Sequence, residues 1–255
     1  MDKPLISIIT VTYNAEKTVG RTLESVASQT FSDYEHVIID GASTDGTLVI
    51  IDSSAGKDHR KVFSEPDKGL YDAMNKGLDI AQGNYVVFLN AGDKFHSEST
   101  LKLIAEAINE HGNPGVVYGQ TVLVDNDGRY IAPRHLKAPE NLTLSDFAKG
   151  MVVCHQAFVA KKSIVPFFSL RYRYSADYEW CIICLQHSKK NIYVGDVLID
   201  YLIEGLSTAN RRKSLVERFN IMSIYYGFWP TLWRHIGFVS RFLSHKRAIA
   251  KGLNS

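Results

Sequence analysis

Residues 5–11 read LISIITV, a β-branched apolar run that leads directly into the polar sequence Thr12-Tyr13-Asn14. A strand that is apolar along its whole length is typical of a sheet covered on both faces. Further strand-like runs before the chain's midpoint read EHVIID at 35–40, KVFS (weaker) at 61–64, NYVVFL at 84–89 and VVYGQ at 116–120. Helical patterns lie between the runs, at roughly 15–28, 46–54, 70–81 and 97–111. This alternation predicts βαβ units, a parallel sheet and right-handed crossovers, which together define an α/β fold.

The alternation fades after residue 120. Asp125-Asn126-Asp127-Gly128 lies between two β-like runs and predicts a hairpin. The elements expected beyond it are a helix near 144–149, an apolar stretch over Met151–Ala160, a helix over Ala176–His187 and a late strand over Val197–Ile203. Because no repeat or low-complexity linker interrupts the chain, we expect residues 121–210 to continue the first domain and complete its site.

The composition excludes several classes of protein. The 255 residues are 45% hydrophobic and 22% charged, unlike collagen-like, low-complexity or wholly disordered chains. This length suits one large α/β domain, with or without an appendage. The three cysteines do not suggest a disulfide framework. Cys181 and Cys184 are separated by two isoleucines on a predicted helix, which favours buried free thiols over a metal finger or a redox motif.

The formal net charge of +2 hides an uneven distribution. Residues 211–255 carry nine Lys or Arg against the single acid Glu217, a net charge of +8, whereas the preceding 210 residues carry −6. Eight of the 28 aromatic residues also fall in this tail. Its longest uncharged run, Asn220–Trp233, has 14 residues, whereas a membrane-spanning helix needs about 20. Since Met1–Leu5 shows no signal peptide, a cytoplasmic protein is expected.

Candidate ligand-binding residues follow three of the predicted strands, because ligands of open α/β sheets bind beyond the carboxyl ends of the strands. Asp40 is either part of a turn that leads into the next helix, or an acceptor for the N–H of a nucleotide base. Tyr13 is either a core residue or a platform that stacks on that base. Asp93 is either a turn residue bonded to its own backbone, or a ligand of a divalent metal, which prefers oxygen donors.

Two predicted helices carry further polar candidates. The helix at 70–81 has an apolar face of Leu70, Met74, Leu78 and Ala81 and a polar face of Asp72, Asn75, Lys76 and Asp79. Its polar face is explained by solvation, and its N-terminus, which follows Glu65–Gly69, could bind a phosphate.

The helix at 176–187 begins with two acids, Asp177 and Glu179, which favour the positive end of the helix or supply a general base. His155 and Gln156 lie in an apolar stretch, where a hydrogen-bonded core histidine is the ordinary expectation and a substrate contact is the alternative.

Taken in order, these segments resemble the family 2 glycosyltransferases over roughly residues 5–210. The matching motifs are SIITVTYN at 7–14, QTF at 29–31, DGASTDGT at 40–47, EPDKG at 65–69, AQG at 81–83, FLNAGD at 88–93 and ADYE at 176–179. The resemblance implies a GT-A fold with a mostly parallel central sheet. Its parts would be a Rossmann-like half at 1–120 that binds a nucleotide-diphospho-sugar, an acceptor-binding half at 121–210, and a basic, aromatic, helical tail at 211–255.

The resemblance also implies roles for individual residues in an inverting, metal-assisted sugar transfer. Asp177 would be the catalytic base, and Asp93 would bind Mn²⁺ or Mg²⁺. The residues implied in positioning the acceptor or donor are His155, Gln156 and Glu179. Those implied in binding the nucleotide-sugar are Thr10, Val11, Tyr13, Asp40, Asp72, Asn75, Lys76, Asn90, Ala91 and Gly92.

Three positions depart from the family pattern. Asn90 and Gly92 stand where many relatives carry acids, so weaker metal binding is expected. Met74 stands where many relatives carry arginine, and Lys68 or Lys76 could supply the missing charge.

The expected activity is transfer of a sugar to a saccharide or lipid-linked saccharide, in the synthesis of a bacterial-type surface polysaccharide. One alternative is a sugar-phosphate nucleotidyltransferase, although the glycine-rich first loop common in such enzymes is missing after Val11. Another is a non-catalytic sugar-nucleotide-binding protein.

The tail is either a cap packed on the body or a peripheral contact at the inner face of the plasma membrane, which its cations and aromatics favour. The acidic body argues against a nucleic-acid partner.

Overall fold

The structure is a computed structural model in which residues 3–203 and 211–236 are described. The predicted tail is therefore described up to residue 236, and its remainder, 237–255, lies outside the described residues. The strands are β1 (Ile6–Thr12), β2 (Tyr34–Asp40), β3 (Arg60–Ser64), β4 (Tyr85–Phe88), β5 (Lys94–Phe95), β6 (Val116–Val124), β7 (Tyr130–Pro133), β8 (Phe158–Lys161) and β9 (Asn191–Leu202). The α-helices with defined bounds are α1 (Val19–Ala27), α2 (Thr47–Ser53), α3 (Leu70–Ile80), α4 (Thr100–Glu110), α5 (Ala176–His187) and α7 (Arg211–Tyr226). Short 3₁₀ turns are η1 (Lys57–His59), η2 (Leu144–Lys149), η3 (His155–Ala157) and η4 (Lys162–Ile164).

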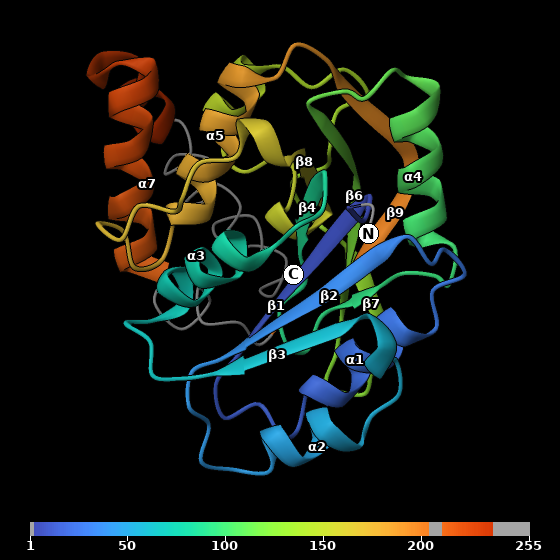
Figure 1. Ribbon diagram of the computed structural model, residues 1–255. Helices are drawn as coiled ribbons and strands as arrows, with labels where there is room; N and C mark the ends of the chain where they lie inside the picture. The colour runs from blue at the N-terminus through green and yellow to red at the C-terminus, as the bar shows by residue number, and fades with distance from the viewer. Residues whose placement is uncertain (1–2, 204–210, 237–255) are drawn as a thin grey trace, which may run out of the picture.

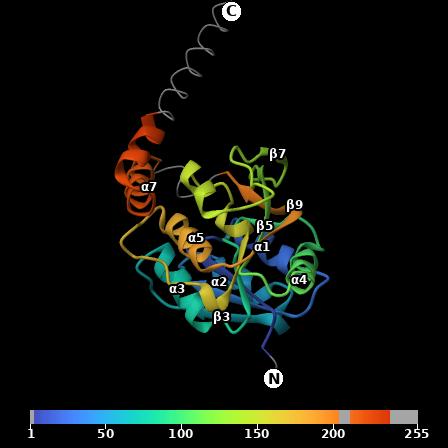
Figure 2. The ribbon, with the colours of Figure 1, turned by 90° about the horizontal axis from the view of Figure 1, so that it is seen from above.

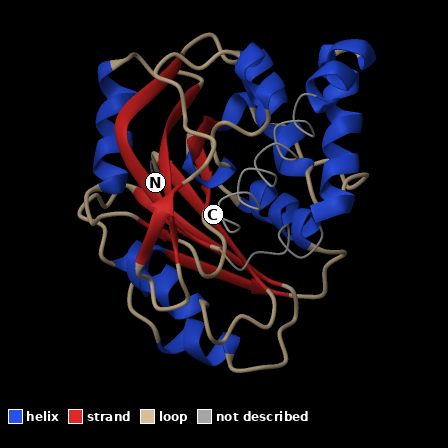
Figure 3. Cartoon of the chain, turned by 180° about the vertical axis from the view of Figure 1, so that it is seen from behind, coloured by secondary structure: helices blue, strands red, loops and turns tan. Residues whose placement is uncertain are grey.

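Within the described residues, the strands form one curved sheet (Figure 3). Their order is β3-β2-β1-β4-β8-β6-β9-β5, and β7 pairs with β6 beside this path. The first four strands of this order are parallel to one another. β8 is antiparallel to both of its neighbours, whereas β6 and β9 are again parallel. The predicted α/β fold with a mostly parallel sheet is confirmed.

Helices cover both faces of the sheet, as the apolar strands predict. Ile9 and Val11 of β1 face a core shared with α3 and α5, whereas Ile6 and Ile8 face a core shared with α4 (Figure 1). This division follows from the alternation of side chains along a strand. The predicted apolar face of α3 lies in the first core, where Met74, Leu78 and Ala81 are buried and Leu70 packs against them.

The chain beyond residue 120 differs from the sequence-based expectation in three respects. β8 overlaps the end of the predicted apolar stretch and continues to Lys161, because the three apolar residues Phe158–Ala160 have no periodicity that separates a strand from other buried backbone. The late strand β9 begins at Asn191 and not at Val197. The predicted helix at 144–149 is a 3₁₀ turn, begun by a capping box between Thr143 and Asp146.

The predicted boundary at residue 120 falls inside β6, and strands from both sides of it alternate in the sheet. The division into a donor half and an acceptor half is functional and stays a prediction. The predicted buried free thiols are confirmed, since Cys181 and Cys184 are both buried and unpaired by disulfides.

The described part of the tail packs on the body through α7, which lies against α5 (Figure 2). Ile221 and Met222 are buried in the core that contains α3 and α5. The Glu217 carboxylate accepts hydrogen bonds from the backbone N–H groups of Arg173 and Tyr174 at 2.9 and 2.8 Å. No helix in residues 3–203 and 211–236 combines the length and the apolar character needed to cross a bilayer.

Candidate active site

The carboxyl ends of three neighbouring strands, β2, β1 and β4, place the predicted polar loops along one edge of the sheet (Figure 1). The loops after β1 and β2 hold each other in place. The backbone N–H of Asn14 donates to the Ser43 hydroxyl at 2.9 Å, and the N–H of Thr44 donates to the Asn14 side-chain oxygen at 2.9 Å. Asn14 and Ala42 both have left-handed backbone angles, with φ of 48° and 59°. Such conformations persist only where the surroundings fix them, so this edge is preorganised.

Asp40 lies at the centre of these loops and is fully buried. Its carboxylate accepts hydrogen bonds from the hydroxyls of Thr12 at 2.9 Å and Ser64 at 2.7 Å, and from both the hydroxyl and the backbone N–H of Ser43 at 2.5 and 2.9 Å. Burial alone would raise the pKa of Asp40, but these hydrogen bonds outweigh it and lower the pKa. The carboxylate therefore joins three strand ends, and a contact with a nucleotide base stays a prediction.

Tyr13 lies on the surface of this edge, with 67% of the residue exposed. A Cβ atom added to Gly41 would lie 3.3 Å from the Tyr13 ring and 2.4 Å from an Asp67 carboxylate oxygen. The missing side chain of Gly41 therefore leaves room for both groups. An exposed ring beside a carboxylate and an open backbone has the form of a platform on which a flat base could stack.

The turn at Asn90–Asp93 is fixed from two sides. The Thr22 hydroxyl of α1 donates to the Asp93 backbone carbonyl at 2.6 Å and accepts from the Gly92 N–H at 2.9 Å. On the other side, the Gln156 side-chain oxygen accepts from the Asn90 N–H at 2.9 Å. Gly92 has a φ of +101°, which strains any other residue. A side chain at position 92 would therefore strain this turn and would meet Leu202.

The Asp93 side chain is almost fully buried within this turn. One carboxylate oxygen accepts from the Gln156 amide at 2.6 Å, and the other accepts from the Leu202 N–H at 2.7 Å. Burial raises the pKa of Asp93 to about 6, against the lowering effect of these hydrogen bonds and of the nearby His155 and Arg21. A buried carboxylate in this state is stabilised by any additional positive charge beside it.

The turn offers oxygen donors to a metal, although it is not a cluster of acids. Among residues 3–203 and 211–236, no group of three or more His, Cys, Asp or Glu side chains is arranged to hold a metal ion. The Asn90 side-chain oxygen, however, is buried without a hydrogen-bond partner. A carboxylate and an amide oxygen are ligands that Mg²⁺ and Mn²⁺ accept, with nucleotide phosphates and waters completing the shell. The residues present therefore fit a divalent metal held jointly with a diphosphate.

Asp177 lies in the first turn of α5 and is held by three groups. The Tyr71 hydroxyl of α3 donates to its Oδ1 at 3.1 Å, and the backbone N–H of Tyr178 donates to the same oxygen at 2.9 Å. The Nδ1 of His155 lies 3.4 Å from the other oxygen, Oδ2. The structure thus brings together two residues that are 22 positions apart in the sequence and were both proposed as site residues.

The imidazole of His155 interacts electrostatically with both acids of the site. Burial would lower the pKa of its imidazole, but the hydrogen bond with Cys154 and the charges of Asp177 and Asp93 outweigh burial and raise it. Its Nε2 atom is buried without a hydrogen-bond partner. A buried ring nitrogen without a partner costs stability, so its position points to a ligand contact or an ordered water.

Other predicted site residues have side chains engaged elsewhere. Asn75 exchanges two hydrogen bonds with the backbone of Phe168, at 2.9 and 2.6 Å. Lys76 forms an ion pair with Glu65 at 2.7 Å. Glu179 accepts a hydrogen bond from the hydroxyl of Tyr225 in α7. Asp72 accepts one from the backbone N–H of Lys68. The Thr10 hydroxyl is hydrogen-bonded to His36. Val11 is buried in the core, and Ala91 lies beside the core formed by α1 and α2.

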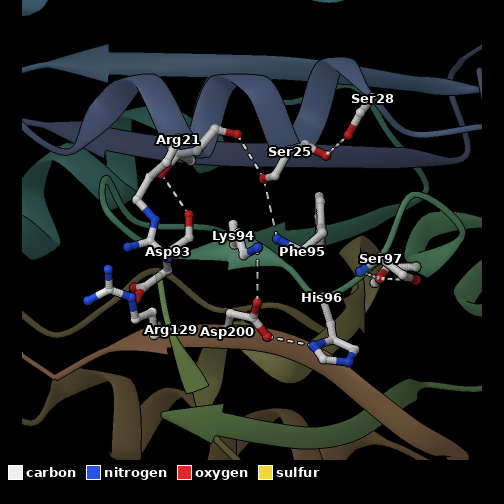
Figure 4. Close-up of polar contacts among 12 residues, drawn as sticks. Arg21, Ser25, Ser28, Asp93, Lys94, Phe95, His96, Ser97, Arg129 and Asp200 are labelled. Carbon is white, nitrogen blue, oxygen red and sulfur yellow. Dashed lines mark hydrogen bonds and ion pairs between the residues drawn. The ribbon is translucent and has the colours of Figure 1, made fainter. Parts of the chain in front are cut away.

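A polar groove of about 540 Å³ lies on the α1 side of the Asp93 turn. Figure 4 shows Arg21 of α1 pointing toward Asp93, and Asp200 of β9 beneath β5. The Asp200 carboxylate pairs with Lys94 at 3.2 Å and with His96 at 2.6 Å. These contacts fix β5 on β9.

Sequence reasoning missed several residues that build the site, above all Tyr71 and Thr22. Thr22 lies inside an ordinary helical pattern, and nothing in its spacing marks it. Tyr71 lies on the buried side of α3, where its hydroxyl needs a hydrogen-bond partner. The need for a hydrogen-bond partner could have marked Tyr71 as a site residue, but the partner, Asp177, is 106 residues away in the sequence.

The sheet, the loops at its carboxyl edge and the acids gathered there define a GT-A glycosyltransferase. Comparison with known proteins agrees: residues 7–166 match the model of glycosyl transferase family 2, and the chain belongs to this family.

Several bacterial glycosyltransferases are similar to this chain. The chain is 33% identical over 192 residues to a PGL/p-HBAD biosynthesis glycosyltransferase of Mycobacterium bovis (strain BCG / Pasteur 1173P2). The matched region covers 73% of this chain and 72% of that protein. It is 35% identical over 153 residues to the putative teichuronic acid biosynthesis glycosyltransferase TuaG of Bacillus subtilis, covering 59% of this chain and 60% of TuaG. The crystal structure of S. aureus TarS 1-349 with UDP-GlcNAc has a TM-score of 0.70 at 21% identity, covering 92% of this chain and 73% of that chain. Against the same fragment solved with UDP, the chain spans 64% of its length.

Proposed function

We propose that this chain is an inverting glycosyltransferase that moves a sugar from a nucleotide-diphospho-sugar to a hydroxyl of a saccharide or lipid-linked saccharide in polysaccharide synthesis. The observation that carries this proposal is the convergence of Asp93, His155 and Asp177 at the edge of the sheet that also presents Tyr13. The names of TuaG and of the TarS complex with UDP-GlcNAc support a surface-polysaccharide role and a nucleotide-sugar donor.

The donor would bind along the preorganised edge. Tyr13 would stack on the base, which then lies over Gly41 beside Asp67, and the diphosphate would extend toward the Asn90–Asp93 turn. Asp93 and Asn90 would hold a divalent metal there. When bound, such a metal stabilises the negative charge of the departing nucleoside diphosphate.

Asp177 would act as the general base. The acceptor hydroxyl gives its proton to the Asp177 carboxylate while its oxygen forms a bond to the anomeric carbon. The bond from that carbon to the diphosphate breaks on the opposite face, and the electron pair leaves with the nucleoside diphosphate. One displacement of this kind inverts the configuration at the anomeric carbon and needs no protein nucleophile.

The test is release of a nucleoside diphosphate from candidate donors in the presence of acceptor. Replacement of the base, Asp177→Asn, is expected to lower the rate by about 10²- to 10⁴-fold without unfolding the protein. Asp52→Asn is the matched control, since this acid of α2 has a largely exposed side chain and lies outside the predicted site. Release of pyrophosphate from a nucleoside triphosphate and a sugar phosphate would identify a nucleotidyltransferase instead. Donor binding without turnover would identify a non-catalytic binder.

We further propose that the tail contacts an anionic membrane surface. Trp229, Trp233 and Ile236 follow the i, i+4, i+7 spacing of one helical face, and they are 67%, 69% and 50% exposed. Thr231, on another side of this helical segment, is fully buried. Glu217 is the last acid of the chain, so the sequence beyond it carries only positive formal charge. Exposed Trp residues beside cations suit the headgroup region of anionic lipids.

Vesicle co-sedimentation tests this contact. Deleting the whole tail would remove Ile221 and Met222 from the core, so the exposed face is changed alone, by the double substitution Trp229→Ser and Trp233→Ser. The double variant is expected to lose most of its binding to vesicles with anionic lipid. The control is Val49→Ser, which removes a similarly exposed apolar side chain from α2. Equal sedimentation of the wild type and the double variant would reject the contact.

A further inference from the structure

The Tyr71 hydroxyl, on the helix α3 beside the predicted donor loops, contacts the proposed base Asp177. Tyr71 belongs to the first turn of α3, and its Oη donates to Asp177 Oδ1 at 3.1 Å. The residue is only 6% exposed, and its ring stacks on Phe168 with a centroid distance of 5.5 Å and an interplanar angle of 23°. Packing therefore fixes the ring, and the ring fixes the direction of the hydroxyl.

The hydrogen bonds at Asp177 are divided unequally between its two oxygens. Oδ1 accepts from Tyr71 and from the backbone N–H of Tyr178, so its position is set by two donors. Among the residues that the structure describes, Oδ2 faces only His155 Nδ1, at the longer distance of 3.4 Å. The titratable groups around Asp177 are Tyr71 from α3, His155 from η3 and Cys181 within α5. This arrangement holds Oδ1 and leaves Oδ2 as the oxygen that can take a proton from an acceptor.

The residues just before this first turn of α3 lie at the predicted donor edge. Gly69, which precedes α3, donates its N–H to the Asp67 carboxylate at 2.7 Å, and the Asp67 carboxylate also lies against Gly41. The N–H of Lys68 donates to Asp72, the residue after Tyr71, at 3.0 Å. The segment that lines the predicted donor edge thus continues directly into the residue that holds Asp177.

We infer that Tyr71 is a positioning residue, which aligns the Asp177 carboxylate for proton transfer from the acceptor and does so from the donor side of the site. This inference rests on the proposed function of Asp177. A hydroxyl of this kind touches neither substrate nor the reacting atoms, and it acts on the rate through the orientation of the base.

The test is Tyr71→Phe, which keeps the ring and its stacking on Phe168 and removes only the hydroxyl. We expect kcat to fall by about 10- to 100-fold, with the KM for the donor and the affinity for the nucleoside diphosphate unchanged. The matched control is Tyr85→Phe, because Tyr85 is also buried and donates its hydroxyl to the Pro114 carbonyl at 2.7 Å. This control is expected to keep the wild-type kcat.

A double variant distinguishes positioning from general damage. Added to Asp177→Asn, Tyr71→Phe is expected to cause little further loss of rate, since the hydroxyl acts through the carboxylate that is already gone. Wild-type kcat in Tyr71→Phe, an equal loss in Tyr85→Phe, or additive losses in the double variant would overturn the inference. If Asp177→Asn is as active as the wild type, the proposed base fails first, and the two failures are thereby separated.

Discussion

The absence of a side chain at Gly41 determines the shape of the predicted donor edge. This glycine follows Asp40, whose carboxylate is saturated by hydrogen bonds within the protein. The fixed Asp40 holds the backbone of the loop, and the absent side chain of Gly41 lets Tyr13 and Asp67 come together above it. The sequence predicted Asp40 and Tyr13 as a pair that faces a base. The structure makes Asp40 the support of the platform on which the base is expected to lie, and a contact between Asp40 and the base stays a prediction.

Gly41→Ala is expected to weaken the binding of nucleoside diphosphates by about tenfold, or about 1.4 kcal/mol. The added Cβ would lie 2.4 Å from Asp67 Oδ2 and 3.3 Å from the Tyr13 ring, so both groups must move. Because Asp67 can rotate away, the free energy of unfolding should change by less than about 1 kcal/mol. Isothermal titration calorimetry and thermal unfolding measure the two quantities. Unchanged affinity would show that these groups do not line the donor site.

Element packing is tight where α3 crosses β1. Gly77 lies on the helix face toward the sheet, where an added Cβ would lie 2.4 Å from Ile9 Cγ2 and 3.4 Å from Ile39 Cγ1. The glycine therefore lets α3 approach the sheet, and this approach carries Tyr71 to the position from which it reaches Asp177. The apolar face of α3 was predicted correctly from its spacing, but the depth of the helix on the sheet was not visible in that pattern.

Gly77→Ala is expected to destabilise the protein by about 1–3 kcal/mol, because extra volume in a packed core forces side chains or backbone to shift. Glycine to alanine substitutions within helices otherwise stabilise, so the sign itself is informative. Gly20→Ala in α1 is the matched control, since its Cβ would meet only Ile50 at an ordinary 3.8 Å. Chemical denaturation of both variants measures the difference. An equal or greater stability for Gly77→Ala would mean that α3 is free to shift outward.

At the scale of the whole molecule, one core joins the segments on both sides of residue 120. Trp180 of α5 is almost fully buried. Its ring centroid lies 5.6 Å from Phe88 in β4, 5.8 Å from Phe158 in β8 and 5.3 Å from Phe168. Elements from the predicted donor half and the predicted acceptor half therefore share one aromatic cluster.

This shared core predicts a single cooperative unfolding transition. The chain has three tryptophans, so Trp229→Phe with Trp233→Phe leaves Trp180 as the only tryptophan reporter. Its fluorescence and the far-ultraviolet circular dichroism of the same variant should change at one common denaturant midpoint. Two separated midpoints would mean that the halves unfold independently.

Much of this organisation could be predicted from the sequence, for reasons that are local. Continuous β-branched apolar runs located the first four strands, a period of 3.6 residues located the helices between them, and polar strand ends marked the candidate site. The antiparallel insertion of β8 between β4 and β6 is a long-range pairing, which local periodicity cannot report. The same limit applies within the site: His155 and Asp177 were both candidates, but Tyr71 and Thr22 became visible only when distant elements were placed together.

The hydrogen bonds of Glu217 also set an order of events during protein synthesis. Arg173 and Tyr174, just before α5, donate their backbone N–H groups to a carboxylate 44 and 43 residues later in the chain. Since translation proceeds from the N-terminus, these two residues leave the ribosome before Glu217 has been made. The strands β1 to β4 and their helices can already form at that stage. The segment around the proposed base is therefore completed last, when α7 has emerged and docked.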